Sequence, residues 1–368
     1  MAGYKKHRPD IWLVLIVLML VAFGLVMVYS SSSAMASQLG VDSHYYAMNQ
    51  AKWASLGIGV MFATTFLPLK WFKKGAMPIY IFGLLLLAAL YIPSLAITRG
   101  GATRWLNLRF TTFMPSEVAK IAIVILLAKK FSEIKGNLRK LKDVAYCVGL
   151  ILIPCAFILK QPDYSTMLIL IGTTAIMMFI AGLPWIYTIV ATLAGGSGLV
   201  YLAYGAEYRL ERIKTFMDPW KDPSGHGWQV IQSLYAIASG GLIGLGYGKS
   251  RQKYGYLPES MSDFIFAIIA EEMGFLGASL LVILFVLFLW RGYRISRKTD
   301  DVFASFLAVG FTSMICLQAI VNMAVVTSSI PATGITLPFI SAGGSSLVMS
   351  LIAVGMMLNA SRAKPSAL

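Results

Sequence analysis

Long runs of apolar residues, separated by polar segments, recur along the whole 368-residue chain. Each run has about 17–25 residues, the length that an α-helix needs to cross a bilayer. Only 13% of the residues are charged and the mean hydropathy is +0.73, whereas soluble domains carry about 25% charged residues. We find no series of short alternating segments of the kind that builds a transmembrane β-barrel. The sequence therefore predicts an all-α polytopic membrane protein, with residues 1–368 as a single domain.

Ten apolar runs are candidate transmembrane helices, and an even number places both termini on one side of the membrane. The first run follows Lys5, Lys6 and Arg8, as a signal peptide would, but it is longer than a signal-peptide core and is interpreted as a retained helix. The predicted spans are residues 11–33, 51–67, 76–96, 116–130, 144–160, 165–182, 185–205, 264–290, 302–326 and 345–360.

Lysine and arginine are concentrated in one set of loops between these runs. The basic residues of these segments are Lys5, Lys6 and Arg8; Lys70, Lys73 and Lys74; those from Lys129 to Lys142; those from Arg291 to Lys298; and Arg362 with Lys364. The positive-inside rule makes these loops and both termini cytoplasmic. The net charge of +15 therefore reflects topology rather than nucleic-acid binding, for which no soluble basic domain is present.

The largest loop on the opposite, extracytoplasmic side spans residues 206–263, between the seventh and eighth helices. Loops of this length are usually functional. Its own apolar segment, residues 228–248, is broken by glycines, and we expect a helix that lies at the outer interface, followed by a glycine turn.

Asp263 stands where this loop turns into the very apolar run that starts at residue 264. A charged group inside a bilayer costs roughly 2.5–3.5 kcal/mol and tends to mark a pathway or a reaction site. We therefore interpret Asp263 as a catalytic group, the alternative being a helix cap. Glu271 and Glu272 follow about two turns deeper; each needs its own partner, and we interpret both as structural or gating groups.

Arginines at 99, 104 and 109 precede a predicted helix that Pro115 opens. Guanidinium groups match phosphate oxygens well, so Arg104, Arg109 and Lys120 are predicted to attract phosphate. Glu117 and Lys120 are three residues apart and share a helix face. The alternative is that they only neutralise one another at the helix start.

Three further segments supply candidates for substrate binding: those around Asp163 and around Arg209, and residues 328–346. Asp163 follows a proline and either caps the next helix or joins the site. Arg209 and Arg212 lie among Tyr, Phe and Trp residues, and either snorkel from an interfacial helix or meet an anionic lipid head group.

Residues 328–346 combine two prolines, three glycines and several hydroxyls at membrane depth. Irregular backbone is tolerated there only when it is buried in protein or lines a cavity. Ser341, Gly343 and Gly344 are thus predicted to contact a sugar or a pyrophosphate, with a plain turn as the alternative.

From the residues alone, the chain has a polar outer cavity with one candidate base and several cations, which suits an anionic, lipid-linked substrate. These features do not separate an enzyme from a transporter. The three cysteines show neither zinc spacing nor a disulfide framework.

Five motifs resemble those of the SEDS family (shape, elongation, division and sporulation), which includes FtsW, RodA and SpoVE. They are FMPSEVAK (113–120), QPDYST (161–166), GWQVIQSLYAIASGGLIGLGYGKSRQKYGYLPE (227–259), SDFIFAIIAEE (262–272) and PATGITLPFISAGGSS (331–346). The resemblance covers about residues 10–360, and the SRQKYGYLPE and GGSSL strings are closer to FtsW and SpoVE than to RodA. The chain departs from the family at Ser262 (usually Thr), at Tyr164-Ser165 (commonly Leu-Gly) and at Ala342 (commonly Tyr).

The resemblance implies a ten-helix peptidoglycan glycosyltransferase of the bacterial cytoplasmic membrane, with its active site outside the cytoplasm. Such an enzyme polymerises lipid II, an undecaprenyl-pyrophosphate-linked disaccharide pentapeptide, into glycan strands. It works beside a class B penicillin-binding protein and other division or sporulation membrane proteins. The essential Asp of the family falls on Asp263, next to the hydroxyl of Ser262, and its Glu–Lys pair falls on Glu117 and Lys120.

No cofactor is expected with certainty. A divalent cation, Mg²⁺ or Mn²⁺, would share the charge of the pyrophosphate, and Asp263 would then be its ligand instead of the general base. A lipid II flippase or transporter is the main alternative function, because broken helices and intramembrane carboxylates also suit a transporter. A non-catalytic scaffold of a division or sporulation complex is the third.

Overall fold

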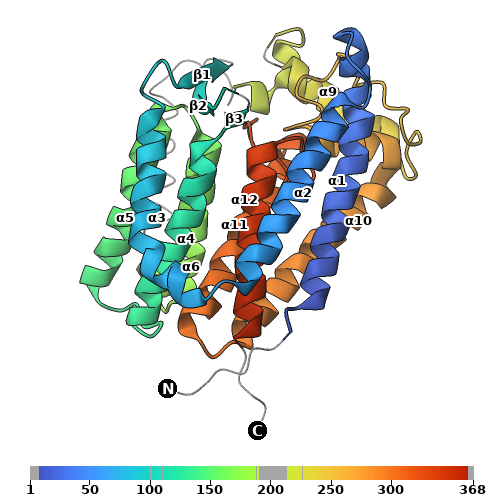
Figure 1. Ribbon diagram of the computed structural model, residues 1–368. Coiled ribbons are helices and arrows are strands. Elements are labelled where there is room, and N and C mark those ends of the chain that lie inside the picture. Colours follow the sequence, from blue (N-terminus) through green and yellow to red (C-terminus); the bar gives the residue numbers. More distant parts are fainter. Residues whose placement is uncertain are drawn as a thin grey trace.

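The computed structural model describes residues 8–99, 102–109, 111–187, 189, 214–225 and 227–363. Long helices form a bundle, shown in Figure 1. They are α1 (Ile11–Gln38), α2 (Tyr45–Phe66), α3 (Leu69–Ala89), α4 (Pro115–Glu133), α5 (Leu141–Lys160), α6 (Tyr164–Ile180), α9 (Trp228–Gly240), α10 (Ile265–Arg297), α11 (Val302–Val326) and α12 (Gly344–Arg362). A short 3-10 helix, η1 (Pro219–Lys221), precedes α9.

Six of the described helices are long and apolar enough to cross a membrane, namely α1, α3, α5, α10, α11 and α12. The predicted span 302–326 matches α11 to the residue. The poorest match is α3, predicted at 76–96, because the helix begins directly after Pro68 and carries three lysines in its first two turns. The predicted span 185–205 lies mostly outside the described residues.

Helix α4 lies at the centre of the bundle, where it packs against α3, α6 and α11. All of its residues from Pro115 to Ala128 are buried. Pro115 suits the first turn because its missing N–H has no partner to find there. A helix surrounded on every side needs no apolar stripe, so the polar side chains that α4 carries inward have to find partners inside the protein.

The segment around Arg99 to Arg109, for which no strand is predicted, contains a small antiparallel sheet. Its strands are β1 (Ala96–Arg99), β2 (Ala102–Asn107) and β3 (Thr112–Phe113), in the order β1-β2-β3. The all-α prediction is wrong in this detail, because strands of two to six residues are too short to give a clear alternating pattern. The sheet lies over one end of the helix bundle (Figure 1), and β2 contacts α4.

The long helix α10 is broken at Gly274, which has φ 64° and ψ −165°. The glycine-rich turn after α9 fills the break, since the Phe275 N–H donates to the Gly241 oxygen at 2.9 Å and the Leu245 N–H donates to the Glu271 oxygen at 2.9 Å. Helix α9 has 13 residues, about 20 Å at 1.5 Å per residue, which is shorter than the bilayer core. The expected helix and glycine turn are therefore present.

Glu271 and Glu272 each have the separate partners that the sequence required. Glu272 pairs with Lys253 at 2.9 Å and accepts the Ser30 hydroxyl at 2.7 Å. Glu271 accepts the Ser250 hydroxyl at 2.5 Å. These buried bonds attach the 248–253 turn to α1 and α10, which is a structural role.

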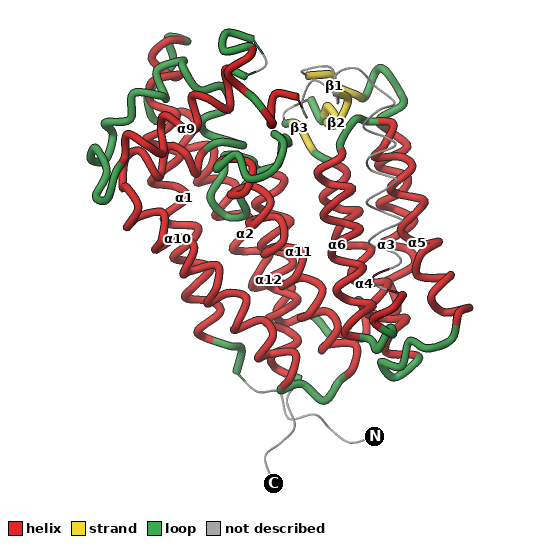
Figure 2. The backbone as a smooth tube through the Cα atoms, turned by 180° about the vertical axis from the view of Figure 1, so that it is seen from behind, coloured by secondary structure: helices red, strands yellow, loops and turns green. Residues whose placement is uncertain are grey.

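The two ends of the described chain lie at the same end of the bundle. The Asp10 N–H, just before α1, donates to the Ser361 hydroxyl of α12 at 3.0 Å, and the Asp10 carboxylate pairs with Arg291 at 2.8 Å. The sheet and α9 lie at the opposite end (Figures 1 and 2). The fold thus separates a basic end from an end that carries the predicted site residues.

Candidate active site

A cavity of about 420 Å³ lies at the end of the bundle that carries the sheet. Residues from β2, α4, the turn before α10, the 334–336 segment and the start of α12 line it. We call it the cationic cavity after Arg104 and Lys120, whose side chains line it together with the carboxylates of Glu117, Glu259 and Asp263. It also collects five other predicted site residues, Glu117, Ser262, Asp263, Gly343 and Gly344.

Asp263 lines this cavity from the turn just before α10. The N-cap residue of α10 is Phe264, and no side chain caps that helix, so Asp263 is not held in place as a cap. The pKa of Asp263 is raised to about 7, first by burial and then by the charges of Glu259 and Asp163, while Arg104 lowers it. A carboxyl group with a pKa near the operating pH suits proton transfer.

The main chain around Asp263 is fixed by two polar side chains. Asn322 of α11 donates to the Asp263 oxygen at 2.8 Å and to the Ile335 oxygen at 2.7 Å. The Ser341 hydroxyl donates to the Ser262 oxygen at 2.6 Å. Ser341 is buried and joins the two loops rather than lining the cavity.

Glu117 and Lys120 form a buried ion pair of 2.9 Å. Lys120 also donates to the Gln318 side-chain oxygen at 2.8 Å, and Gln318 donates to the Thr336 oxygen at 3.0 Å. The two charges neutralise one another and the pair also forms part of the cavity wall, so the two interpretations of this motif are compatible. Sequence reasoning missed Gln318 and Asn322, although a polar residue inside an apolar span is a signal of function.

Arg104 on β2 is oriented by the start of α6. Its guanidinium lies 3.8 Å from the Asp163 carboxylate and donates to the Pro162 oxygen. Asp163 caps α6 by accepting the Thr166 N–H at 3.3 Å and the Thr166 hydroxyl at 2.7 Å. Asp163 is 1% exposed, so it positions Arg104 from behind the cavity wall.

Among the described residues, Arg109 is a predicted site residue that does not line the cavity. Arg109 is exposed between β2 and β3, with φ 67° and its N–H bonded to the Asn107 side chain at 2.9 Å. Arg209 and Arg212 lie outside the described residues.

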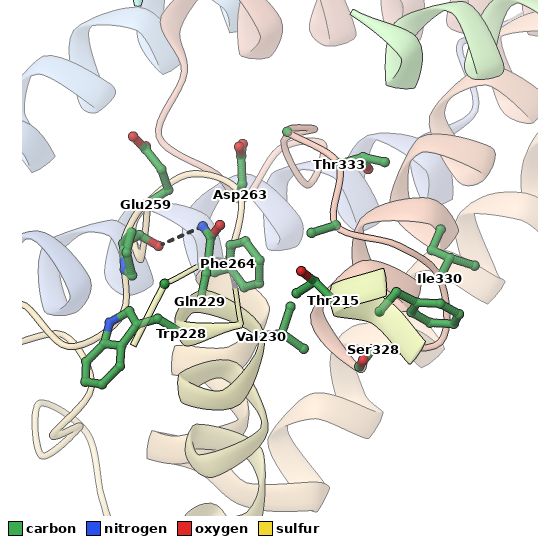
Figure 3. Close-up of a pocket in the computed structure, with 15 residues that line it drawn as sticks. Thr215, Trp228, Gln229, Val230, Glu259, Asp263, Phe264, Ser328, Ile330 and Thr333 are labelled. Atoms are coloured by element: carbon green, nitrogen blue, oxygen red, sulfur yellow. Dashed lines mark hydrogen bonds between the residues drawn. The ribbon is translucent and has the colours of Figure 1, made fainter. Parts of the chain in front are cut away.

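A second cavity, of about 500 Å³, is also lined by Asp263. Figure 3 shows the carboxyl groups of Glu259 and Asp263 pointing the same way, above Gln229 and Phe264. Glu259, Asp263 and Gly334 line both cavities. Glu259 has φ 52° and accepts the Ser262 hydroxyl at 2.5 Å. Backbone strain of this kind concentrates at functional sites.

The described residues contain no group of three or more His, Cys, Asp or Glu that would hold a metal ion. Three carboxylates line the cationic cavity; Glu117 is paired with Lys120, and Glu259 and Asp263 offer oxygen ligands to a hard cation.

Comparison with known proteins gives consistent matches over almost the whole chain. The model of the FtsW/RodA/SpoVE family, described as "Cell cycle protein", matches residues 11–366. Stage V sporulation protein E of Bacillus subtilis (strain 168) is 42% identical, over 97% of this chain and 98% of its own. A probable peptidoglycan glycosyltransferase FtsW of Trichlorobacter lovleyi is 39% identical, over 97% of this chain and 94% of its own.

Solved structures of similar chains share the fold. A chain from the work described as "Structural coordination of polymerization and crosslinking by a peptidoglycan synthase complex" aligns with a TM-score of 0.79 and 30% identity, over 96% of this chain and 98% of its own. The rod shape determining protein RodA of Thermus thermophilus aligns with a TM-score of 0.72 and 28% identity, over 98% of each chain.

Proposed function

The chain belongs to the FtsW/RodA/SpoVE family of cell cycle proteins, and from this premise we propose how its two cavities work. The protein is a peptidoglycan glycosyltransferase of the FtsW/SpoVE type, like the curated relatives that carry this activity in their names. Its substrate is lipid II, and its product is a glycan strand. The observation that carries the proposal is a carboxyl group with a pKa near 7 beside two cations in one cavity.

In the proposed reaction, the 4-hydroxyl of a GlcNAc attacks the anomeric carbon of a lipid-linked MurNAc. A carbon–oxygen bond forms between the two sugars. The bond from the anomeric carbon to the pyrophosphate breaks, and its electron pair leaves with undecaprenyl pyrophosphate. Asp263 takes the proton of the attacking hydroxyl, a contribution worth roughly 10²–10⁴-fold in rate.

The cationic cavity stabilises the charge that grows on the pyrophosphate. Arg104 is held from behind by Asp163, and Lys120 faces the same space. The start of α12, at Gly343 and Gly344, also lines the cavity, and the N-terminus of a helix favours anions. The three groups come from β2, α4 and α12, so they surround the leaving group.

The proposal includes a divalent cation, Mg²⁺ or Mn²⁺, which would share in neutralising the charge that grows on the pyrophosphate. Asp263 would then be its ligand instead of the general base, and the ion would act as a Lewis acid toward the pyrophosphate oxygens. Removing metal with EDTA and adding back each ion, with metal binding measured separately by calorimetry on wild type and Asp263→Asn, tests this part.

The basic end of the bundle is proposed to face the cytoplasm, with both termini, which places both cavities at the outer face of the membrane. The ten-span count and the outer loop at 206–263 belong to the same proposal. A complex of polymerisation and crosslinking is described for a structural neighbour, and this supports a class B penicillin-binding protein as partner. Other division or sporulation membrane proteins follow from the similarity to FtsW and SpoVE.

The lipid II flippase is the second candidate, and the broken helix α10 with its buried carboxylates is what favours it. Those carboxylates are already paired, Glu272 with Lys253 and Glu271 with Ser250. A group that has to couple to transport needs freedom to change its partner, so these bonds favour the glycosyltransferase.

Polymerisation of lipid II by the purified protein with its class B partner tests the proposal, with only the crosslinking partner blocked by a β-lactam. Long glycan products from the wild type that vanish with Asp263→Ala are expected. Lipid II movement across proteoliposomes without any polymer would support the flippase instead. Polymer from both proteins would keep the enzyme but remove Asp263 as its base.

A further inference from the structure

A third cavity, of about 360 Å³, lies at the basic end of the bundle, opposite the end that carries the sheet (Figure 1). It is lined by the turn between α2 and α3, the residue that caps α11, and the end of α12; these residues are 66–70, Asp301, Asn359, Arg362 and Ala363. We call it the basic-end cavity. Its volume is within the range of roughly 300–1,000 Å³ that holds small ligands, and the glycosyl transfer proposed above makes no use of it.

The wall of the basic-end cavity is held by side chains of α12. Asn359, which is buried, donates to the Thr64 oxygen at 2.9 Å. Arg362 donates to the Thr65 oxygen at 2.8 Å, and its guanidinium carbon lies 4.6 Å from the centre of the Phe66 ring. These contacts join the end of α12 to the end of α2, so the cavity and the position of its arginine do not depend on a ligand.

Positive charge prevails in the basic-end cavity. Lys70 and Arg362 line it, and Asp301 is the one carboxylate among the residues that line it. The Asp301 carboxylate caps α11, where it accepts the Phe303 N–H at 2.8 Å and the Ala304 N–H at 3.3 Å. Helix α3 begins at this cavity with no side-chain cap and no acidic residue in its first turn, so its positive end adds to the two cations. The cavity therefore favours an anion, and arginine matches phosphate oxygens well.

The rim of the basic-end cavity is apolar and aromatic. Phe66 is 56% exposed and Trp71, in the first turn of α3, is 64% exposed. Leu69 lines the cavity between them. Tryptophan is enriched at the boundary between the head groups and the acyl chains of a bilayer. An anion that carries its own acyl chains fits this surrounding better than a free anion does.

We propose that the basic-end cavity binds the phosphodiester head group of an anionic phospholipid. Lys70, Arg362 and the first turn of α3 surround the phosphate, and the acyl chains lie against Phe66 and Trp71. Basic pockets between transmembrane helices bind lipid head groups in this way. The bound lipid joins α3 to α12 at the end of the bundle opposite the cationic cavity. This inference depends on a membrane location and not on the proposed reaction.

Native mass spectrometry of the purified full chain tests the proposal. The protein, in a mild detergent, is incubated with equal amounts of phosphatidylglycerol and phosphatidylcholine, and the lipids that each protein molecule retains are counted. We expect one phosphatidylglycerol to be retained several-fold more often than phosphatidylcholine. Inorganic phosphate at millimolar concentration should not displace it, because a free anion lacks the contacts of the acyl chains.

Variants locate the retained lipid. Lys70→Gln is expected to reduce retention of phosphatidylglycerol several-fold, and Lys70→Arg should restore it. Because Lys70 is exposed, these changes leave the fold intact, whereas Arg362→Gln also removes the bond to Thr65. Lys298→Gln is the matched control, since it removes an exposed lysine at the same end of the bundle that does not line the cavity.

Thermal unfolding gives a second readout. Phosphatidylglycerol should raise the unfolding midpoint of the wild type and of Lys298→Gln, and most of this rise should be lost in Lys70→Gln. Retention that falls equally in Lys70→Gln and Lys298→Gln would show only a general attraction to basic loops and would overturn the proposal. Equal retention of phosphatidylcholine, or displacement by inorganic phosphate, would overturn it as well.

Discussion

The side-chain amide of Asn322 donates a hydrogen bond of 2.8 Å to the main-chain oxygen of Asp263. The same amide bonds the Ile335 oxygen at 2.7 Å, so one side chain of α11 holds both the turn that carries the base and the irregular segment that faces it. Within the described part of the chain, the carboxylate of Asp263 makes no hydrogen bond or ion pair. Its position is therefore fixed through the backbone, while burial and nearby charges set its affinity for protons.

Replacing Asn322 by Leu is expected to reduce polymerisation more than it reduces the amount of folded protein. Two main-chain oxygens lose their donor, at about 1–3 kcal/mol for each unsatisfied group, and the base loses its support. The control is Asn359→Leu, since Asn359 likewise bonds two main-chain oxygens, of Thr64 and Leu67, at the basic end of the bundle. Thermal unfolding and polymer yield per folded protein should separate the two variants; equal activity losses would contradict the positioning role.

The rate of glycosyl transfer is expected to have an acidic limb near neutral pH. Burial raises the pKa of Asp263 from 3.8 to about 7, and a general base works only when it is ionised. Below the pKa the carboxyl is protonated, so the rate falls about tenfold for each pH unit; above it the rate levels off. Initial rates under single-turnover conditions would measure this limb. A limb near the ordinary pKa of an aspartate would contradict the effect of burial.

Glu259→Gln is expected to move that limb to lower pH. Glu259 is the second largest cause, after burial, that raises the pKa of Asp263, and glutamine keeps an oxygen that can accept the Ser262 hydroxyl. Arg104 and Asp163 also act on this carboxyl and remain unchanged in the variant. The control is Asp218→Asn, because it removes a carboxylate that lines neither of the cavities at Asp263. Rates of Glu259→Gln and of this control, measured over the same pH range, should differ in this limb alone; an unmoved limb would show that Glu259 acts only through the backbone.

Lys120→Met should destabilise the protein strongly, because it leaves the Glu117 carboxylate buried without its partner. Breaking a buried pair in this way typically costs about 3–5 kcal/mol. The double variant with Glu117→Gln and Lys120→Met should recover most of this stability. It should not recover the polymerisation rate, since the cavity still lacks the positive charge of Lys120. Unfolding midpoints in detergent and polymer yields together test this. Activity in the double variant would mean that Lys120 has no role beyond structure.

Gly274→Ala is expected to destabilise the break in α10. The backbone there has φ 64°, and a Cβ would lie 2.3 Å from the Gly244 nitrogen. Strain of this kind costs about 1–3 kcal/mol before any clash. Gly59→Ala is the control, because Gly59 lies within α2 and nothing is within 4 Å of its Cβ position; it should gain roughly 0.5–1 kcal/mol. Unfolding midpoints that shift alike would contradict the account of the break.

Much of the fold follows from local patterns. Apolar runs of membrane length predicted the helices, and α11 was placed to the residue, because Asp301 caps its start and its apolar run ends with the helix. The predicted bounds of α3 are wrong, and the sequence does not predict the sheet of β1, β2 and β3. The apolar run does not show where α3 begins, because the first turns of the helix carry lysines. Strands of a few residues are too short to show a periodic pattern.

The candidate site was also foreseen in part. Asp263, Glu117 and Lys120 stood out because ionisable groups beside or inside apolar runs are rare and costly. Gln318 and Asn322 were missed because a single amide in an apolar span shows no partner until the neighbouring loops are in place.

The sequence by itself determined which residues had to be buried and which polar groups therefore needed a partner, since apolar run length and the cost of an unpaired charge are local properties. Only the tertiary structure decided which partners they found. Arg104 lies within β2 and lines the cavity, whereas Arg109, five residues on, follows the end of β2 and is exposed. The cavity around Asp263 likewise depends on contact between segments far apart in the chain, and packing, not local pattern, sets such contacts.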